Sequence, residues 1–290
     1  MSEVAPKKRS DLQIRAVLAP TMLAIIGGIF WADSTQLLGL TRGALSGGLL
    51  ALLGVAGAWE YVQLMRAGGF AVAGKTLQVY TALLMAAAFL LGWHQIDREL
   101  YPPVAATMLL LFPLAVRSLG KADMKVGLEK QGATLLGFLM VAWPMYFAIG
   151  ICFRHLPSIL YVVLVCKGGD IGGYCLGRLF GRHKLIPHVS PGKTIEGALG
   201  SLATSVALAV ALRGALLEPE VHLPLWAALV TGAALNFTTQ TGDLIESLLK
   251  RRCGAKDSSN LLPAHGGVLD LVDSLLFSFC AWFLVLVWIT

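Results

Sequence analysis

The stretch KRRCGAKDSSNLLPAHGGVLDLVDS spans residues 250–274 and concentrates polar groups beside the last apolar segment of the chain. It holds five cationic residues, counting His265 as protonatable, together with three aspartates and a paired glycine. The segments on either side are among the most apolar of the chain. Such a placement suggests that these charges meet a ligand or each other rather than only solvent.

The composition around this block is typical of a membrane protein. Of 290 residues, 56% are hydrophobic and 14% charged, whereas soluble domains have about 25% charged residues. An apolar run of roughly 20 residues is long enough to cross a bilayer. We identify nine such segments, at residues 14–32, 38–59, 76–94, 102–117, 132–153, 156–171, 194–216, 223–243 and 269–289. The sequence therefore predicts an all-α polytopic membrane protein with about nine transmembrane helices.

The distribution of lysine and arginine predicts the orientation of these helices. With nine spans and a cytoplasmic N-terminus, the inner segments and their edges hold 18 of these residues and the outer segments hold four. Cytoplasmic loops of membrane proteins carry such an excess. We therefore expect the N-terminus and residues 244–268 on the cytoplasmic side. The first apolar run is long for a signal peptide and is expected to be a retained span.

Ionisable residues within or beside the spans concentrate in the second half of the chain. Such groups are costly at membrane depth and usually face a cavity or a partner. Lone residues such as Glu60 and Arg42 are interpreted as side chains that reach up to the membrane surface. We accordingly divide the chain into N-terminal transmembrane helices, 1–153, and a C-terminal catalytic transmembrane region, 154–290.

The first polar cluster, KGGDIGGYCLGRLFGRHK, begins at Lys167. Lys167 and Asp170 are three residues apart and could pair on one helix face. Gly168, Gly169, Gly172 and Gly173 allow two interpretations. They could weaken the helix, so that backbone groups line a polar cavity, or they could allow close helix packing. The second interpretation rests on Gly173, Gly177 and Gly181, which recur at every fourth position. The basic residues that follow are either positive-inside charge or a binding site for anionic phosphates.

The second cluster, SPGKTIEG, begins at Ser190. Ser190 with Pro191 in the first turn is a good helix start, and Thr194 is a rival cap. Either cap would place free backbone N–H groups and Lys193 at one helix N-terminus, where phosphate binds well. The spacing of a P-loop is absent.

The third cluster includes the opening stretch. Asp243 and Lys250 would lie on one helical face, and Asp270 and Asp273 would share another. Glycines and Pro263 interrupt the helix between them. Two carboxylate faces joined by a basic loop are a candidate site for a divalent cation and phosphates, because Mg²⁺ prefers one or two carboxylates, waters and phosphate oxygens.

At these positions the chain resembles the phosphatidate cytidylyltransferases, also called CDP-diacylglycerol synthases. The pattern S-x-x-K-R-x-x-x-x-K-D-(x)n-P-x-H-G-G-x-x-D-x-x-D runs from Ser247 to Asp273. The upstream segments GDLIESLLKR, GRLFGRHKLIPHVSPGKTIEG and GDIGGY resemble the same family in the same order, so the resemblance covers roughly residues 165–275. The chain departs from the pattern D-R-x-D at Leu271, where arginine is usual, and Ala264 replaces a frequent glycine.

The resemblance implies that CTP and phosphatidate react to give CDP-diacylglycerol and pyrophosphate, with Mg²⁺ as cofactor. Catalytic roles are implied for Asp243, Lys256, Asp257 and Asp270, and metal binding for Asp243, Asp270 and Asp273. Substrate binding is implied for Ser190, Lys193, Lys250, Arg251, His265, Gly266, Gly267 and Asp170. The implied partners are CTP, phosphatidate and membrane lipid. No nucleic acid is expected, a homodimer is compatible with the sequence, and the site would face the cytoplasm, at the inner membrane in a bacterium.

Three other interpretations stay open. A secondary transporter would also have broken helices and buried charges, although residues 14–153 hold almost none of the latter. A catalytically impaired family member is suggested by Leu271. A third is a CTP-dependent enzyme that acts on another membrane-embedded phosphate or alcohol. Arg252 is the extra cation nearest in the motif, and we expect it to supply the charge that Leu271 lacks.

Overall fold

The structure, a computed structural model, describes residues 21, 24–94, 101–119, 124–259, 261 and 266–289. Its first half contains α2 (Ala44–Ala67), α3 (Gly74–Trp93), α4 (Tyr101–Leu119), α5 (Met124–Gly137), the π-helical turn η1 (Phe138–Ala142) and α6 (Trp143–Arg154). Its second half contains α7 (Pro157–Phe180), β1 (Lys184–Ile186), β2 (Ser190–Thr194), α8 (Ile195–Leu216), α9 (Leu225–Arg252) and α10 (Val268–Ile289). Apart from one short hairpin, the described elements are helical, as predicted.

Six helices in the described part of the chain are long and apolar enough to cross a membrane. They are α2, α3, the continuous stretch Gly127–Arg154, α7, α8 and α10. The apolar helices Ala24–Ser34 and Pro102–Val116 are shorter, and the first predicted span lies partly outside the described residues. The structure thus has the helices of a multi-pass membrane protein, while the count of nine stays a prediction.

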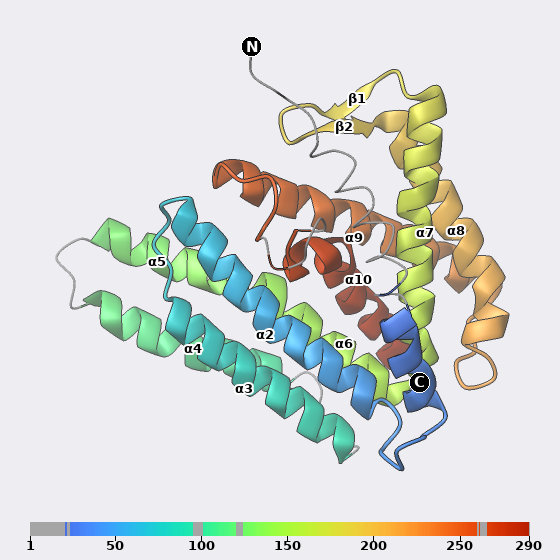
Figure 1. Cartoon of the computed structure of the whole chain (residues 1–290), viewed down its shortest axis with the longest axis horizontal. Coiled ribbons are helices and arrows are strands. Elements are labelled where there is room, and N and C mark those ends of the chain that lie inside the picture. Colours follow the sequence, from blue (N-terminus) through green and yellow to red (C-terminus); the bar gives the residue numbers. More distant parts are fainter. Residues whose placement is uncertain are drawn as a thin grey trace.

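Helix α10 lies between two groups of helices (Figure 1). It packs against α2 and α6 on one side and against α7 and α9 on the other. Among the described elements, α7 and α8 form the most extensive contact, and the β1–β2 hairpin lies at one end of this pair. Helices from both halves of the chain therefore lie against α10.

The glycines of α7 serve helix packing, and the predicted weakening of the helix is wrong. Helix α7 is continuous through residues 168–173. A Cβ atom at Gly173 would lie 2.9 Å from Ser201 Cβ and 3.0 Å from the Gly197 carbonyl oxygen, so only glycine permits this approach of α8. The close packing stabilises the helix despite the low helix propensity of glycine.

The segment after α7 forms a hairpin rather than the helix start predicted at Ser190. Strand β2 pairs antiparallel with β1, so Ser190 and Lys193 are held in extended backbone. The helix begins later, where Thr194 Oγ1 accepts a hydrogen bond of 3.1 Å from Gly197 N. The rival cap is thus confirmed, and the hairpin places Lys193 beside Asp243 of α9.

Glu60 of α2 is buried, so its interpretation as a side chain that reaches the membrane surface is wrong. Its carboxylate accepts hydrogen bonds from Val268 N at 2.9 Å, Leu269 N at 2.7 Å and Ser259 Oγ at 2.6 Å. A carboxylate at a helix N-terminus satisfies unpaired N–H groups and meets the positive end of the helix dipole. The N-terminal half of the chain thereby fixes the position of α10.

Candidate active site

A cavity of about 640 Å³ lies between α7, the hairpin, the start of α8, the middle of α9 and the first turns of α10. Its volume is within the range of small-molecule sites. Six charged residues line it, namely Lys167, Arg178, Lys193, Asp170, Asp243 and Asp273. Ser190 and the α7 glycines Gly173 and Gly177 also belong to its wall. The cavity therefore combines cations that can bind phosphates with carboxylates that can bind a metal ion.

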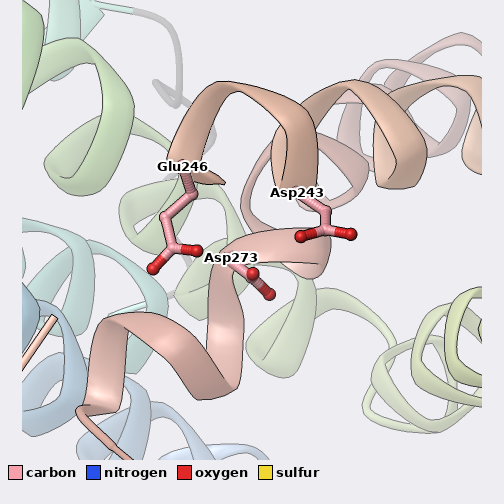
Figure 2. A group of neighbouring side chains, drawn as sticks. All are labelled: Asp243, Glu246 and Asp273. Carbon is pink, nitrogen blue, oxygen red and sulfur yellow. The ribbon is translucent and has the colours of Figure 1, made fainter. Parts of the chain in front are cut away.

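Three carboxylates meet where α9 crosses the start of α10 (Figure 2). Asp243 and Glu246 project from α9 toward Asp273 of α10, and each offers an oxygen within 4.8 Å of the other two. Glu246 is fully buried. Because all three donors are hard carboxylate oxygens, the group fits Mg²⁺ better than a softer metal such as zinc.

The sequence interpretation missed Glu246. It lies three residues after Asp243, a spacing that places two side chains on neighbouring positions of one helix face. That spacing was the available signal. The motif pattern instead drew attention to Asp270, which the structure places outside the group of three.

Asp270 is held by four hydrogen bonds from the protein. Its Oδ1 accepts from Lys250 Nζ at 2.7 Å, and its Oδ2 accepts from Ser258 N, Ser258 Oγ and Gly267 N at 2.8, 2.7 and 2.8 Å. These donors bind both carboxylate oxygens of Asp270, and they come from the end of α9, the following loop and the start of α10. Asp270 therefore acts in this structure as a connector of elements.

Lys250 connects Asp270 with Glu246, a member of the group of three carboxylates. Its Nζ lies 2.6 Å from Glu246 Oε2 and 2.7 Å from Asp270 Oδ1, and its side chain is 14% exposed. Burial alone would lower the pKa of Lys250, but its hydrogen bonds and charge interactions with Asp270 and Glu246 raise that pKa above its ordinary value. The ammonium therefore stays charged and fixes Glu246 beside Asp243 and Asp273.

Lys193 and Asp243 are in direct contact within the cavity. Lys193 Nζ lies 2.5 Å from Asp243 Oδ2, and Ser247 Oγ donates to Asp243 Oδ1 at 3.4 Å. The pairing expected between Lys167 and Asp170 is not formed, because the Lys167 ammonium turns to α10 instead. Both lysines thus reach the cavity from the elements that flank α9 and α10.

Several predicted site residues lie away from the cavity wall. Arg251, Lys256 and Asp257 are exposed, on the end of α9 and the loop that follows, and none of them lines the cavity. His265 lies outside the described residues.

The paired glycine lets the backbone approach protein carboxylates. Gly266 has a φ of 88°, and a Cβ atom there would lie 2.6 Å from Asp270 Oδ2. A Cβ atom at Gly267 would lie 2.5 Å from Glu60 Oε2. In this structure the close approach serves Asp270 and Glu60, whereas the sequence predicted an approach to the substrates.

The family model described as the cytidylyltransferase family matches residues 13–289. The chain belongs to the cytidylyltransferase family. This cytidylyltransferase is 35% identical over 277 residues to the phosphatidate cytidylyltransferase of Pseudomonas aeruginosa, covering 91% of this chain and 93% of that protein. It is 31% identical over 231 residues to the protein of the same name from Staphylococcus haemolyticus, covering 70% of this chain and 87% of that protein. The resemblance expected from the motifs is confirmed, and the transporter interpretation finds no support.

In this cytidylyltransferase, the structure shows what surrounds Leu271, the position where the family motif has arginine. Leu271 lies in the first turn of α10, partly buried against the apolar core. Arg252, expected to replace the missing charge, is exposed at the end of α9 and is not part of the cavity wall. The Lys167 ammonium, by contrast, lies 3.4 Å from the carbonyl oxygen of Leu271.

Proposed function

We propose that this cytidylyltransferase transfers the cytidylyl group of CTP to phosphatidate, which yields CDP-diacylglycerol and pyrophosphate. The observation that carries this proposal is the cavity, where Asp243 and Asp273 of the three-carboxylate group lie near several cations among apolar helices. The names of the two relatives point to the same reaction. Helices α7 to α10 supply the cavity wall, which supports residues 154–290 as the catalytic region.

The reaction needs positioning and charge neutralisation more than a protein nucleophile. A phosphate oxygen of phosphatidate attacks the α-phosphorus of CTP, a new P–O bond forms, and the bond to the β-phosphate breaks as pyrophosphate leaves. Both substrates are anionic, so cations must offset their repulsion and the charge of the leaving group. Lys193 and Arg178 have this role in the cavity, with Ser190 and Asp170 as further polar groups for substrate.

Asp243, Glu246 and Asp273 would hold Mg²⁺. When bound there, the ion would supply Lewis-acid stabilisation of the phosphate charge. In this proposal Glu246 replaces Asp270 in the ligand set expected from the sequence, and Asp270 with Lys250 positions the ligands. Arg251 and Lys256 add positive charge to the surface near the end of α9, where they favour the approach of CTP.

The lipid substrate would arrive along α7. Ile171 and Tyr174 on this helix are each 65% exposed, and Tyr174 also lines the cavity. A side chain that belongs to both the apolar outer face and the polar cavity marks a route by which a lipid phosphate can enter while its acyl chains stay in the bilayer.

Incubation of the purified protein with radiolabelled CTP and phosphatidate in detergent micelles tests the reaction. We expect labelled CDP-diacylglycerol, its loss on chelation of divalent ions, and its return with added Mg²⁺. Diacylglycerol in place of phosphatidate should give no product, because it lacks the attacking phosphate. Absence of product with phosphatidate would refute the proposal, and product from another membrane phosphate or alcohol alone would favour the third interpretation.

The cavity is proposed to face the cytoplasm, at the inner membrane in a bacterial cell, because the hairpin and the end of α9 are rich in lysine and arginine. Cysteines introduced by Lys184→Cys and Glu220→Cys into a cysteine-free background test this orientation, since both positions are exposed. We expect a membrane-impermeant maleimide to label residue 220 in intact cells and residue 184 only after permeabilisation. The reverse pattern would overturn the orientation.

A further inference from the structure

Lys167 occupies a position that its local sequence did not predict. It lies near the middle of α7, yet its ammonium donates to Ser274 Oγ at 2.7 Å and to the Leu271 carbonyl at 3.4 Å, both on α10. The side chain is partly buried and lines the cavity beside Asp170 and Asp273. Lys167 therefore places a positive charge in the cavity where the reaction is proposed to occur.

The hydrogen bonds of Lys167 leave its charge available to a ligand. An ammonium has three donors, and the two hydrogen-bond acceptors found for Lys167 are a hydroxyl and a carbonyl, which are neutral. Lys193, by comparison, is in contact with the carboxylate of Asp243. The neutral partners orient Lys167, and neither Asp170 nor Asp273, which line the same cavity, forms a direct ion pair with it, so its ammonium can still bind a phosphate.

The contact of Lys167 coincides with the departure from the motif. Residues three apart share a helix face, so a side chain at position 271 would rise from the same face of α10 as Ser274. The Lys167 ammonium lies against this face. A cation thus reaches from α7 to this turn of α10, where Ser274 lines the cavity, while the Leu271 side chain packs against the apolar core and Arg252 remains exposed outside the cavity.

We propose that Lys167 is a substrate-binding residue that holds a phosphate group in the cavity and provides the charge that Leu271 does not. The proposal rests on the proposed function, because it assumes that CTP and phosphatidate meet in this cavity. Lysine binds phosphate as a point charge with rotatable donors, so it can act from a neighbouring helix where the motif would use arginine from α10. The phosphate belongs either to the nucleotide or to the lipid.

The test compares Lys167→Gln, Lys167→Arg, Leu271→Arg, the double variant Lys167→Gln/Leu271→Arg and the control Arg252→Ala. Glutamine keeps a donor for Ser274 but removes the charge. We expect Lys167→Gln to lower kcat/KM about 10- to 100-fold, the effect of losing one charge-assisted hydrogen bond to phosphate. Leu271→Arg in that background should recover about tenfold, Lys167→Arg should retain more activity than Lys167→Gln because it keeps the charge, and Arg252→Ala should stay within about threefold of wild type.

The two substrates are varied separately, so that a raised KM for CTP or for phosphatidate identifies the phosphate that Lys167 binds. Thermal unfolding in detergent is followed for each variant. A Lys167→Gln variant with wild-type activity would overturn this inference but not the proposed function. The same conclusion would follow if Lys167→Gln lost activity together with a lower unfolding temperature and Leu271→Arg did not restore that activity. A wild type without activity, or an Asp243→Asn variant with full activity, would overturn the proposed site and this inference with it.

Discussion

Asp243→Asn is expected to lower CDP-diacylglycerol formation by about 100- to 1,000-fold while the protein stays folded. Asp243 lines the cavity, contacts Lys193 and belongs to the group of three carboxylates. Loss of one negatively charged metal ligand removes several kcal/mol of charge stabilisation, and each 1.4 kcal/mol corresponds to about tenfold in rate. The side chain is 33% exposed, so the substitution should disturb packing little.

The measurement is initial rate against Mg²⁺ concentration, with thermal unfolding followed in parallel. Glu129→Gln is a suitable control, because this exposed glutamate of α5 lies outside the cavity and its loss also removes one carboxylate. Glu246→Gln should lower the rate in the same way, but it should also lower the unfolding temperature, because Glu246 is buried and paired with Lys250. An Asp243→Asn variant that kept more than about half of the activity would exclude Asp243 as a metal ligand.

Asp270→Asn is expected to reduce stability as well as activity. The Lys250–Asp270 pair is buried, with side chains 14% and 10% exposed, and removal of one member of a buried ion pair costs about 3–5 kcal/mol. Asparagine would also replace an acceptor of Ser258 and Gly267 donors by a group with fewer lone pairs. The unfolding temperature in detergent should therefore fall by several degrees, while that of Asp243→Asn should not change.

This difference separates two hypotheses about Asp270. The motif predicted a metal ligand, and a metal ligand replaced by asparagine would lose activity at an unchanged unfolding temperature. The structure instead gives Asp270 four protein donors. Lys250→Met should lower the unfolding temperature in the same way, since it leaves Glu246 and Asp270 without their shared cation.

The features that the sequence predicted well are local ones. The six long apolar helices follow from length and composition, the glycine strip of α7 from a four-residue spacing, and the cap at Thr194 from the residue types that accept helix N–H groups. The carboxylates of the motif, Asp243 and Asp273, do come together in the structure. Each of these inferences rests either on residues within about one helical turn of each other or on the order of residues in a family motif.

The features that the sequence did not predict depend on partners far along the chain. Glu60 looked like an isolated charge because its donors, Val268 and Leu269, are 208 and 209 residues away. Lys167 looked like a partner of Asp170, since the competing acceptors on α10 could not be seen without the fold. Helix starts near Ser190 compete with strand pairing, and only the pairing of β1 with β2 decides between them.

The buried carboxylate of Glu60 also ties assembly of the protein to the order of its synthesis. Helix α2 emerges from the ribosome long before the start of α10, so an acidic group enters the membrane domain well ahead of the backbone amides that will receive it. An ionised side chain without such donors is costly at that depth. We therefore expect Glu60 to acquire its full set of hydrogen-bond donors only once α10 has joined the earlier helices.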